Sequence, residues 1–523
     1  MQKQVQLKLL PGEAFDDMLI KKHIAQASGI HFKNISGYNI LKRSIDARGK
    51  QPFIIQALQV FIDEPFISRK TTAVHFHDVS KSEKKIIIIG AGPAGLFAAL
   101  KCIESGIKPV ILERGKNVRA RRRDLAILNK QGIINPESNY CFGEGGAGTY
   151  SDGKLYTRST KRGDVHRILQ LLVHFGAEEN ILYDAHPHIG TNKLPHIITR
   201  IREQIISCGG EILFEKKAID FVIAGEKIKS VKTSDGNIFE ADAVVLATGH
   251  SARDIFYLLT EKKILIEFKP FALGVRIEHP QSLIDHIQYH CSSRGDYLPP
   301  SSYSLVEQVK SKGVFSFCMC PGGIIATAST DFNELVVNGW SPSKRNNPFA
   351  NSGIVVGVEE KDIIGLEQFG PLKGILFQKS IEQKAFVHGG GKFAAPAQRM
   401  VDFVENKISS SLPDCSYLPG IHASSLKEIL PAFIYDSLQS GFIAFGKKMK
   451  GYYTNDAVVV ATESRTSSPV RIPRHAVSMH HPQIKNLYPC GEGAGYAGGI
   501  VSAAMDGENA ASAIASVLVS GNV

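Results

Sequence analysis

Cysteine, tryptophan and long apolar runs are scarce in this sequence. Its 523 residues include eight cysteines and one tryptophan. Eight irregularly spaced cysteines are too few for a disulfide scaffold, so we expect reduced thiols. Of two charge-free stretches, Ile86–Leu100 is shorter than the roughly 20 residues of a spanning helix, and Gly313–Thr330 is interrupted by Pro321–Gly323. Neither stretch predicts a transmembrane helix.

The N-terminus has no apolar segment of the signal-peptide kind, since it reads MQKQVQLKLLPGEAFDD. We therefore expect a cytoplasmic protein without membrane contact. Hydrophobic residues make up 43% and charged residues 21%, which excludes wholesale disorder. The 61 basic and 50 acidic residues give a net charge of +11, a mild excess that is compatible with an anionic ligand, with RNA or with neither.

The first 80 residues have the pattern of a small α+β domain. The expected strand, helix, strand and strand are Val5–Leu10, Phe15–Ala27, Tyr38–Asp46 and Phe53–Asp63. The polar, charged segment Asp78–Lys85 predicts a linker to the next domain.

A β-α-β unit with a glycine-rich turn follows this linker. Ile86–Ile89 is typical of a buried strand, Gly90–Gly95 reads GAGPAG, and a helix is expected after it. The next strand, Pro109–Leu112, ends at Glu113, which lies 18 positions after the last glycine. Spacing and context together predict a dinucleotide site, and the alternative is a glycine-rich turn in an unrelated α/β protein.

Each residue type in this unit suits a dinucleotide. Gly90 permits the tight turn, Gly92 lets a pyrophosphate approach the backbone, and Gly95 lets helix and strand pack closely. Glu113 would accept hydrogen bonds from ribose hydroxyls. The predicted cofactor-binding residues of this unit are Gly90, Gly92, Ala94, Gly95, Glu113 and Arg114.

Two later segments point to the same cofactor site. Ala243–Gly249, AVVLATG, predicts a buried strand ending at Thr248 and Gly249, where small residues let the chain pass a cofactor. Asn486–Ala510 predicts a strand, a glycine-rich turn at Gly491–Glu492, and a helix that begins near Gly499 and Ile500.

At this point the chain resembles the glutathione-reductase-like flavoprotein superfamily. The resemblance implies non-covalent FAD, with Glu492 on the ribityl chain where the family usually has Asp, and a helix N-terminus near the flavin pyrimidine ring. Within this superfamily, the chain is most similar to a group of uncharacterised FAD-dependent dehydrogenases. The segments that carry it are Asn139–Arg158, Leu246–Asp254, Ser316–Gly323 and Thr462–Ile472.

A second glycine cluster resembles the one that wraps the cofactor pyrophosphate in this superfamily. It comprises Gly145, Gly146 and Gly148 with Ser151, and the alternative is a surface turn. Arg119 and Arg121–Arg123 form a basic run before it. We expect a solvated helix face there, in preference to a diphosphate contact.

Two pairs of residues are candidates for a substrate site. Ser251 and Arg253 follow the ATG turn, and Glu463 and Arg465 precede the C-terminal segment. Either pair can face the flavin and hold an anionic substrate, because arginine offers a planar fork to carboxylate or phosphate. The alternative is structural ion pairs between domains.

We expect neither a redox pair from the cysteines nor a metal site from the histidines. Cys318 and Cys320 lie in an apolar, strand-like stretch, which should raise the thiol pKa, so we expect packing and no redox pair. The histidines at His186, His188 and His480–His481 lack partners at metal-ligand spacing, so no metal site is predicted.

The sequence thus predicts an α/β fold: a doubly wound, Rossmann-type FAD-binding domain, an inserted mainly β cap domain, and a small N-terminal α+β domain. The expected boundaries are 1–80 for the N-terminal domain, 84–265 and 481–523 for the FAD-binding domain, and 266–480 for the cap.

The predicted function is that of an FAD-dependent oxidoreductase, a dehydrogenase that passes a hydride between a small substrate, which can be anionic, and flavin. No second Rossmann fingerprint appears, although NAD(P)H can still react transiently at the flavin. Two alternatives stay open: a flavoprotein acting with RNA, which the diffuse charge disfavours, and an FAD-binding protein whose N-terminal domain recruits a partner.

Overall fold

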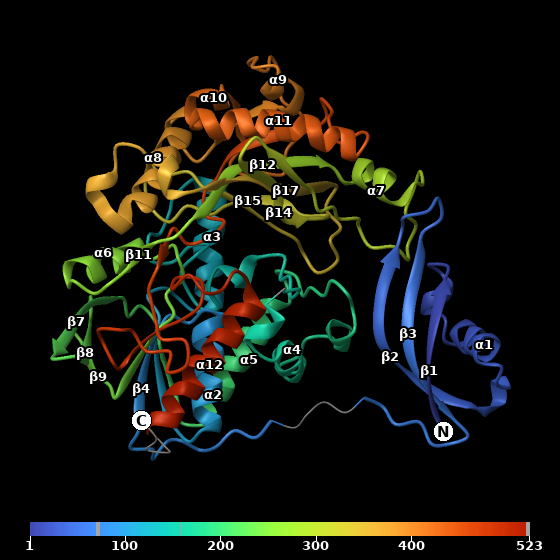
Figure 1. Cartoon of the computed structure of the whole chain (residues 1–523), viewed down its shortest axis with the longest axis horizontal. Helices are drawn as coiled ribbons and strands as arrows, with labels where there is room; N and C mark the ends of the chain where they lie inside the picture. Colours follow the sequence, from blue (N-terminus) through green and yellow to red (C-terminus); the bar gives the residue numbers. More distant parts are fainter. Residues whose placement is uncertain (70–73, 158, 519–523) are drawn as a thin grey trace.

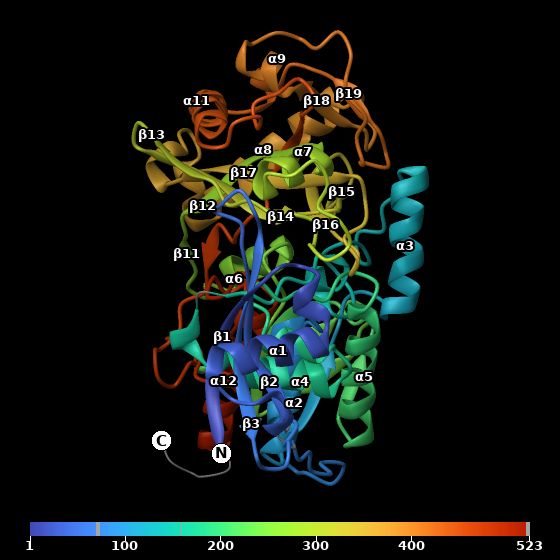
Figure 2. The ribbon, with the colours of Figure 1, turned by 90° about the vertical axis from the view of Figure 1, so that its right-hand side faces the viewer.

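The computed structural model describes residues 1–69, 74–157 and 159–518. Figure 1 shows a parallel sheet with its helices at the base, a second large sheet with helices above it, and a small antiparallel sheet to one side. The view from the side shows the two large parts stacked on each other (Figure 2).

The N-terminal part has the predicted β-α-β-β order. Its strands β1 (Gln2–Leu9), β2 (Ile35–Asp46) and β3 (Phe53–Ile62) form an antiparallel sheet in the order β1-β3-β2. Helix α1 (Asp17–Ser28) begins where the Asp16 carboxylate accepts from the backbone N–H groups of Met18 and Leu19. It ends at Gly29, whose positive φ of 70° suits a glycine C-cap.

Five parallel strands form the base sheet, in the order β22-β10-β4-β5-β6. They are β4 (Lys85–Ile89), β5 (Lys108–Leu112), β6 (Glu211–Leu213), β10 (Ala243–Leu246) and β22 (Leu487–Pro489). The continuous isoleucine run of β4 suits a strand covered on both faces. Ile86 and Ile88 face one hydrophobic cluster, and Ile87 and Ile89 face another.

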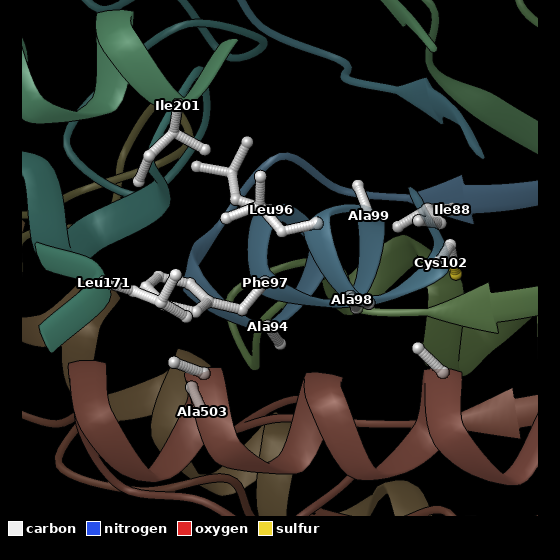
Figure 3. Close-up of a cluster of buried hydrophobic side chains, with 14 of the residues drawn as sticks. Ile88, Ala94, Leu96, Phe97, Ala98, Ala99, Cys102, Leu171, Ile201 and Ala503 are labelled. Atoms are coloured by element: carbon white, nitrogen blue, oxygen red, sulfur yellow. The ribbon is translucent and has the colours of Figure 1, made fainter. Parts of the chain in front are cut away.

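Helices fill the first of these clusters. They are α2 (Pro93–Glu104), α4 (Val165–His174), α5 (Leu194–Ser207) and α12 (Ile500–Leu518). Figure 3 shows α2 alongside α12, with Leu171 and Ile201 on neighbouring helices beside α2. A Cβ added to Gly507 of α12 would lie 2.0 Å from the Ala94 carbonyl oxygen, so the two helices approach closely only with glycine there.

The opposite face is covered by α6 (Arg253–Glu261) and by a small antiparallel sheet. The strands of that sheet are β7 (Ala218–Ala224), β8 (Lys227–Thr233) and β9 (Ile238–Glu240). Helix α3 (Val118–Gln131) extends from the base toward the upper sheet (Figure 2).

The upper part is built on a mixed sheet of order β13-β14-β17-β12-β20-β18-β19. Its strands are β12 (Phe271–Pro280), β13 (Val306–Val309), β14 (Lys312–Cys320), β17 (Phe349–Val358), β18 (Ala395–Arg399), β19 (Ile421–Ala423) and β20 (Val458–Glu463). Two short pairs accompany it: β15 (Ile324–Thr327) with β16 (Val337–Trp340), and β11 (Glu267–Phe268) with β21 (Val470–Arg471).

Helices cover the outer face of this upper sheet, which we call the cap sheet (Figure 1). They are α7 (Gln281–Tyr289), α8 (Lys373–His388), α9 (Met400–Val404), α10 (Leu426–Ile429) and α11 (Ala432–Lys448). The sequence predicted the sheet but did not place these helices.

The expected linker is packed against the base in part. Val79 is 1% exposed, and its backbone N–H donates to the Cys208 carbonyl at 2.8 Å. The N-terminal sheet contacts the base through a bidentate pair, in which Arg43 donates to both carboxylate oxygens of Asp184 at 2.7 and 3.1 Å. Among the helices of the described residues, none combines the length and apolar character of a membrane span.

Candidate functional site

The two glycine clusters meet at the carboxyl end of the base sheet. A Cβ on Gly92 would lie 3.9 Å from the Gly146 Cα, and one on Gly146 would lie 3.1 Å from the Gly92 Cα. Gly145 and Gly146 have φ of 79° and 62°, which favours glycine. Residues 92 and 146 therefore form one backbone cradle, in which side chains would fill the space left for a ligand.

The other two predicted segments reach the same place. A Cβ on Gly90 would lie 2.5 Å from the Ala247 carbonyl oxygen, and one on Gly493 would lie 2.6 Å from that of Gly249. The first residue of α12, Ile500, has its Cγ1 3.1 Å from the Cβ position of Gly148. Cβ positions on Gly249 and Gly499 would meet no atom within 4 Å, so both glycines border open space. Thr248 lies in the same turn.

Glu113 holds the turns together. Its carboxylate is 4% exposed and accepts from the backbone N–H groups of Ala91 at 2.8 Å, Gly115 at 2.8 Å and Gly143 at 3.0 Å. A carboxylate offers about four acceptor positions. Three are used by the backbone, which leaves one for a ligand hydroxyl.

Arg121 corrects the expectation of a solvated arginine run. Arg119, Arg122 and Arg123 are exposed, but Arg121 is fully buried. Its guanidinium donates to the backbone carbonyls of the second glycine loop, namely those of Asn139, Tyr140, Gly143, Glu144 and Gly146. One arginine of the run thus shapes the loop, because its fork matches several carbonyl oxygens at once.

Arg114 and Ser151 bond within the chain. Arg114 donates to Glu137 at 2.7 Å and Asp254 at 2.9 Å, and its guanidinium carbon lies 4.1 Å from the centre of the Phe142 ring. The Ser151 hydroxyl donates to the Gly148 carbonyl at 2.8 Å. The position of Arg114 beside two carboxylates does not point it toward a phosphate.

The C-terminal glycine turn is positioned by a residue that the sequence did not single out. Asp506 of α12 accepts from the Gly491 N–H at 2.7 Å and from both outer nitrogens of Arg474 at 2.6 and 3.0 Å. Glu492 is partly exposed, and its carboxylate lies 3.4 Å from His250 Nδ1. In the sequence, the only indication of this contact is that Asp506 lies in the same C-terminal segment as the glycine turn.

The proposed substrate arginines are instead paired with glutamates. Arg253 donates to both oxygens of Glu382 at 2.8 and 2.9 Å, and Arg465 donates to the same carboxylate at 2.9 and 3.2 Å. Glu334 lies 3.4 and 3.1 Å from the two arginines. Although burial opposes ionisation, the two arginines hold the pKa of Glu382 well below its usual range. We call Arg253, Arg465, Glu334 and Glu382 the arginine–glutamate cluster.

This cluster joins α6 of the base to α8 of the cap, so the alternative of structural ion pairs describes both arginines. Ser251 is 9% exposed, and its carbonyl accepts from the Arg253 N–H at the start of α6. An arginine fork that is already filled by a buried carboxylate is not free to take an anionic substrate.

Glu463 belongs to a second buried group. It accepts from Arg276 of β12 at 2.6 Å, and both side chains are almost fully buried. The same arginine donates to the Cys318 carbonyl at 2.7 Å and lies 3.6 Å from the Cys320 sulfur. Lys154, which follows the second glycine loop, lies 3.6 Å from the Cys318 sulfur. We call Cys318, Cys320, Lys154, Arg276 and Glu463 the cysteine–lysine cluster.

The expectation of apolar surroundings for the two cysteines was therefore wrong. The neighbouring strand residues are apolar, but the cations come from β12 and from the glycine loop, far away in sequence. For metals, the described residues contain no group of three or more His, Cys, Asp or Glu side chains that could hold an ion.

Family models match three stretches of the chain. Residues 1–61 match a domain of unknown function, residues 84–267 match the pyridine nucleotide-disulphide oxidoreductase family, and residues 270–466 match the C-terminal domain-like family of FAD-dependent proteins. An uncharacterized protein of Clostridium beijerinckii is 39% identical over 518 residues, which cover 94% of this chain and 95% of that protein.

The chain therefore belongs to a family of FAD-dependent oxidoreductases in which a pyridine nucleotide-disulphide oxidoreductase domain precedes this C-terminal domain. FAD is its cofactor.

Solved flavoproteins overlap with the chain only loosely. The tetracycline destructase Tet(51) is 11% identical with a TM-score of 0.34 and covers 83% of each chain. A geranylgeranyl bacteriochlorophyll reductase-like protein of Thermoplasma acidophilum is 13% identical with a TM-score of 0.35, over 84% of this chain and 80% of that one. The halogenase PltM reaches 0.37 at 12% identity, over 83% and 70%. Scores this low say nothing about the reaction.

Proposed function

We propose that the protein is an FAD-dependent dehydrogenase, in which a small-molecule substrate beneath the cap exchanges a hydride with the flavin. The observation that supports this most is the meeting of four glycine-rich segments at the carboxyl end of the base sheet, on the side that faces the cap sheet (Figure 1). In open parallel sheets, ligands bind in the crevice beyond this edge.

The residues at this edge fit FAD. The cradle of Gly90, Gly92 and Gly95 with the N-terminus of α2 suits the pyrophosphate, since backbone N–H groups and the helix dipole favour an anion. Gly145, Gly146 and Gly148 would close it from the other side. The free acceptor position of Glu113 suits one ribose hydroxyl. When bound, FAD supplies the electron-accepting isoalloxazine.

The C-terminal turn and α12 would hold the reactive end. Glu492 is the candidate acceptor for a ribityl hydroxyl, and its partly exposed carboxylate beside His250 leaves it room to do so. Thr248 and Gly249 would line the path of the cofactor, because no atom fills the space beside Gly249. Gly499 and Ile500 at the start of α12 would bring its N-terminal N–H groups toward the ring.

The two arginines expected to hold an anionic substrate are engaged by a glutamate. Arg253 and Arg465 both donate to Glu382, so they do not support an anionic substrate. NAD(P)H remains a candidate electron donor that would act directly at the flavin.

Anaerobic stopped-flow reduction of the purified holoprotein tests this function. NADH, NADPH and a panel of oxidisable metabolites would be mixed with it in turn, and free FAD at equal concentration serves as the control. We expect at least one donor to bleach the protein-bound flavin in a saturable way. Reduction that occurs only in the presence of RNA, with steeply salt-dependent binding, would replace this proposal by the RNA-linked alternative.

A further inference from the structure

Cys318 and Cys320 lie at an irregularity in β14 and differ in exposure. The register between β14 and β17 shifts between Phe317 and Cys320, and Cys318 has a positive φ of 46°. Cys318 is partly exposed, whereas Cys320 is fully buried. The Cys320 thiol donates to the Cys318 carbonyl oxygen at 3.3 Å. Cys318 is therefore the more exposed residue of the pair.

Two cations lie against these sulfurs. Lys154 Nζ is 3.6 Å from Cys318 Sγ and 3.9 Å from Cys320 Sγ, and it also donates to the Met319 carbonyl. Arg276 Nη2 is 3.6 Å from Cys320 Sγ. A thiolate is stabilised by neighbouring lysine or arginine, which is the setting in which reactive cysteines occur.

The carboxylates nearby do not cancel this positive charge. Arg276 is matched by Glu463 at 2.6 Å, and Asp152 is matched by Arg345, also at 2.6 Å. Lys154 has only a 3.7 Å contact with the Asp152 carboxylate, which Arg345 already occupies. One cation of the site is therefore left for the thiols.

Other titratable groups near the site are Tyr140, Tyr303, His188 and Glu278, and burial raises the pKa of Tyr303. Burial raises the pKa of Tyr140 and lowers that of His188, so both are neutral near pH 7. Burial also raises the pKa of Glu278 to about 7, and its carboxylate bonds to Ser416. Near pH 7, none of these groups is a fully ionised carboxylate that would pair with Lys154.

The direction of the thiol pKa values agrees with this geometry. The hydrogen bond from Cys320, with Lys154 and Arg276 and against the effect of burial, lowers the pKa of Cys318 well below its usual range. The same hydrogen bond and burial raise the pKa of Cys320. Burial opposes the charge of Lys154, but the two sulfurs and Asp152 raise its pKa.

We propose that Cys318 and Cys320 form a thiol–disulfide exchange site for small disulfides, with Cys318 as the attacking thiolate. The Cys318 sulfur attacks one sulfur of a disulfide RSSR, which forms a mixed disulfide and releases RS⁻. Cys320 passes its proton to that thiolate, and its sulfur then attacks Cys318 Sγ and releases the second RS⁻. The cysteines are oxidised to a disulfide, and the external disulfide is reduced to two thiols. This site goes beyond the proposed flavin reaction and does not depend on it.

Alkylation of the reduced holoprotein by iodoacetamide tests the thiolate. Labelling of each cysteine peptide is followed by mass spectrometry from about two pH units below the ordinary thiol pKa of about 8.5 up to that value. The partly exposed Cys291 serves as the comparison within the same molecule. We expect Cys318 to be labelled at least about tenfold faster than Cys291 at the low end, and to lose that advantage in Lys154→Gln but not in Lys154→Arg.

Two substitutions of the second cysteine separate its roles. Neither Cys320→Ser nor Cys320→Ala removes Lys154, which lies 3.6 Å from the Cys318 sulfur, so both variants should keep fast labelling of Cys318. With 2-hydroxyethyl disulfide as the probe, the unchanged protein should form the internal disulfide, Cys320→Ser should stop at the mixed disulfide on Cys318, and Cys318→Ser should do neither.

The proposal fails if Cys318 is labelled no faster than Cys291, or if Lys154→Gln and Lys154→Arg behave alike. It fails equally if Cys320→Ser does not accumulate the mixed disulfide. Circular dichroism and FAD content of each variant show that it is folded, and the two Cys320 variants still test the proposal where a Lys154 variant does not fold.

Discussion

Two buried charged clusters connect the cap to the base, and they differ in charge balance. The arginine–glutamate cluster has two buried arginines and two carboxylates, and Glu382 bonds to both arginines. The more exposed Lys379 lies 3.4 Å from Glu334 at the edge of the cluster. The cysteine–lysine cluster pairs Arg276 with Glu463 but leaves Lys154 beside the sulfurs.

A buried cation favours reactivity in a neighbouring group only where no carboxylate matches its charge. Taking ions out of water costs free energy, and a matched neighbour offsets that cost without leaving a reactive group. A cluster with a surplus cation instead stabilises whatever can become an anion, and here that group is a thiol. Sequence alone gives both clusters the same appearance, because each contains an arginine and a glutamate on separate segments.

Disrupting the arginine–glutamate cluster should have the largest effect on stability. Glu382→Gln keeps the size of the side chain but leaves Arg253 and Arg465 with Glu334 as their shared partner. We expect a loss of about 3–5 kcal/mol in the free energy of unfolding, measured by urea denaturation. Glu405→Gln, in the exposed pair with Lys407, is the control and should change nothing measurable. Equal effects of the two substitutions would contradict a structural role for the cluster.

Glu278, which lies near Arg276 of the cysteine–lysine cluster, should make the stability of the protein depend on pH. Burial raises its pKa to about 7 from the ordinary 4.5. Between these values the folded protein holds a proton that the unfolded chain has released, so stability falls as pH rises through this window, by up to about 3 kcal/mol. Unfolding free energies measured across it should decrease with pH, and the decrease should be smaller by that amount in Glu278→Gln. An identical pH dependence in both proteins would rule this out.

Glu113 is a further buried carboxylate, and its partners are backbone amides instead of arginines. Glu113→Ala should lower FAD affinity about ten- to a hundredfold, roughly 1.5–3 kcal/mol. It should also lower stability, since the N–H groups of Ala91, Gly115 and Gly143 lose their acceptor. Flavin fluorescence titration and thermal unfolding measure the two effects. Glu113→Gln, which keeps one acceptor oxygen, should lie between; unchanged flavin affinity in the alanine variant would mean that Glu113 does not face the cofactor.

The ion pair between Arg43 and Asp184 is more exposed than the two buried clusters. Both side chains are about one-fifth exposed, so the pair is partly solvated. Arg43→Ala should cost at most about 1 kcal/mol, should matter less at high salt, and should leave FAD content unchanged. Loss of flavin in this variant would show that the N-terminal sheet supports the cofactor site.

The sequence predicted the parts of the site that are local. Three of the glycine turns follow the buried strands β4, β10 and β22, and such a turn at the carboxyl end of a parallel strand can be recognised in a short window. The cluster of Gly145, Gly146 and Gly148 instead follows the loop after α3. The structure brings Gly92 close to Gly146, and Gly249 close to Gly493.

Long-range pairings could not be predicted in the same way. Lys154 and Cys318 are 164 positions apart, and nothing in either segment specifies the other. The arginines of the basic run look alike in the sequence, and only the contacts of Arg121 in the folded protein distinguish it from the others. In the cap, Gly441 weakens the helical signal of α11, yet a Cβ there would lie 2.8 Å from Val314 Cγ1, so glycine is needed where the helix meets the sheet.

The flavin content of the purified protein tests the central claim most directly. Protein would be denatured without proteolysis, and the supernatant and the pellet would be assayed separately for FAD. We predict a yellow protein that releases one FAD per chain into the supernatant, because the glycine cradle and Glu113 hold the cofactor without a covalent bond. A colourless protein that cannot be reconstituted with FAD, but binds NAD, would contradict this claim.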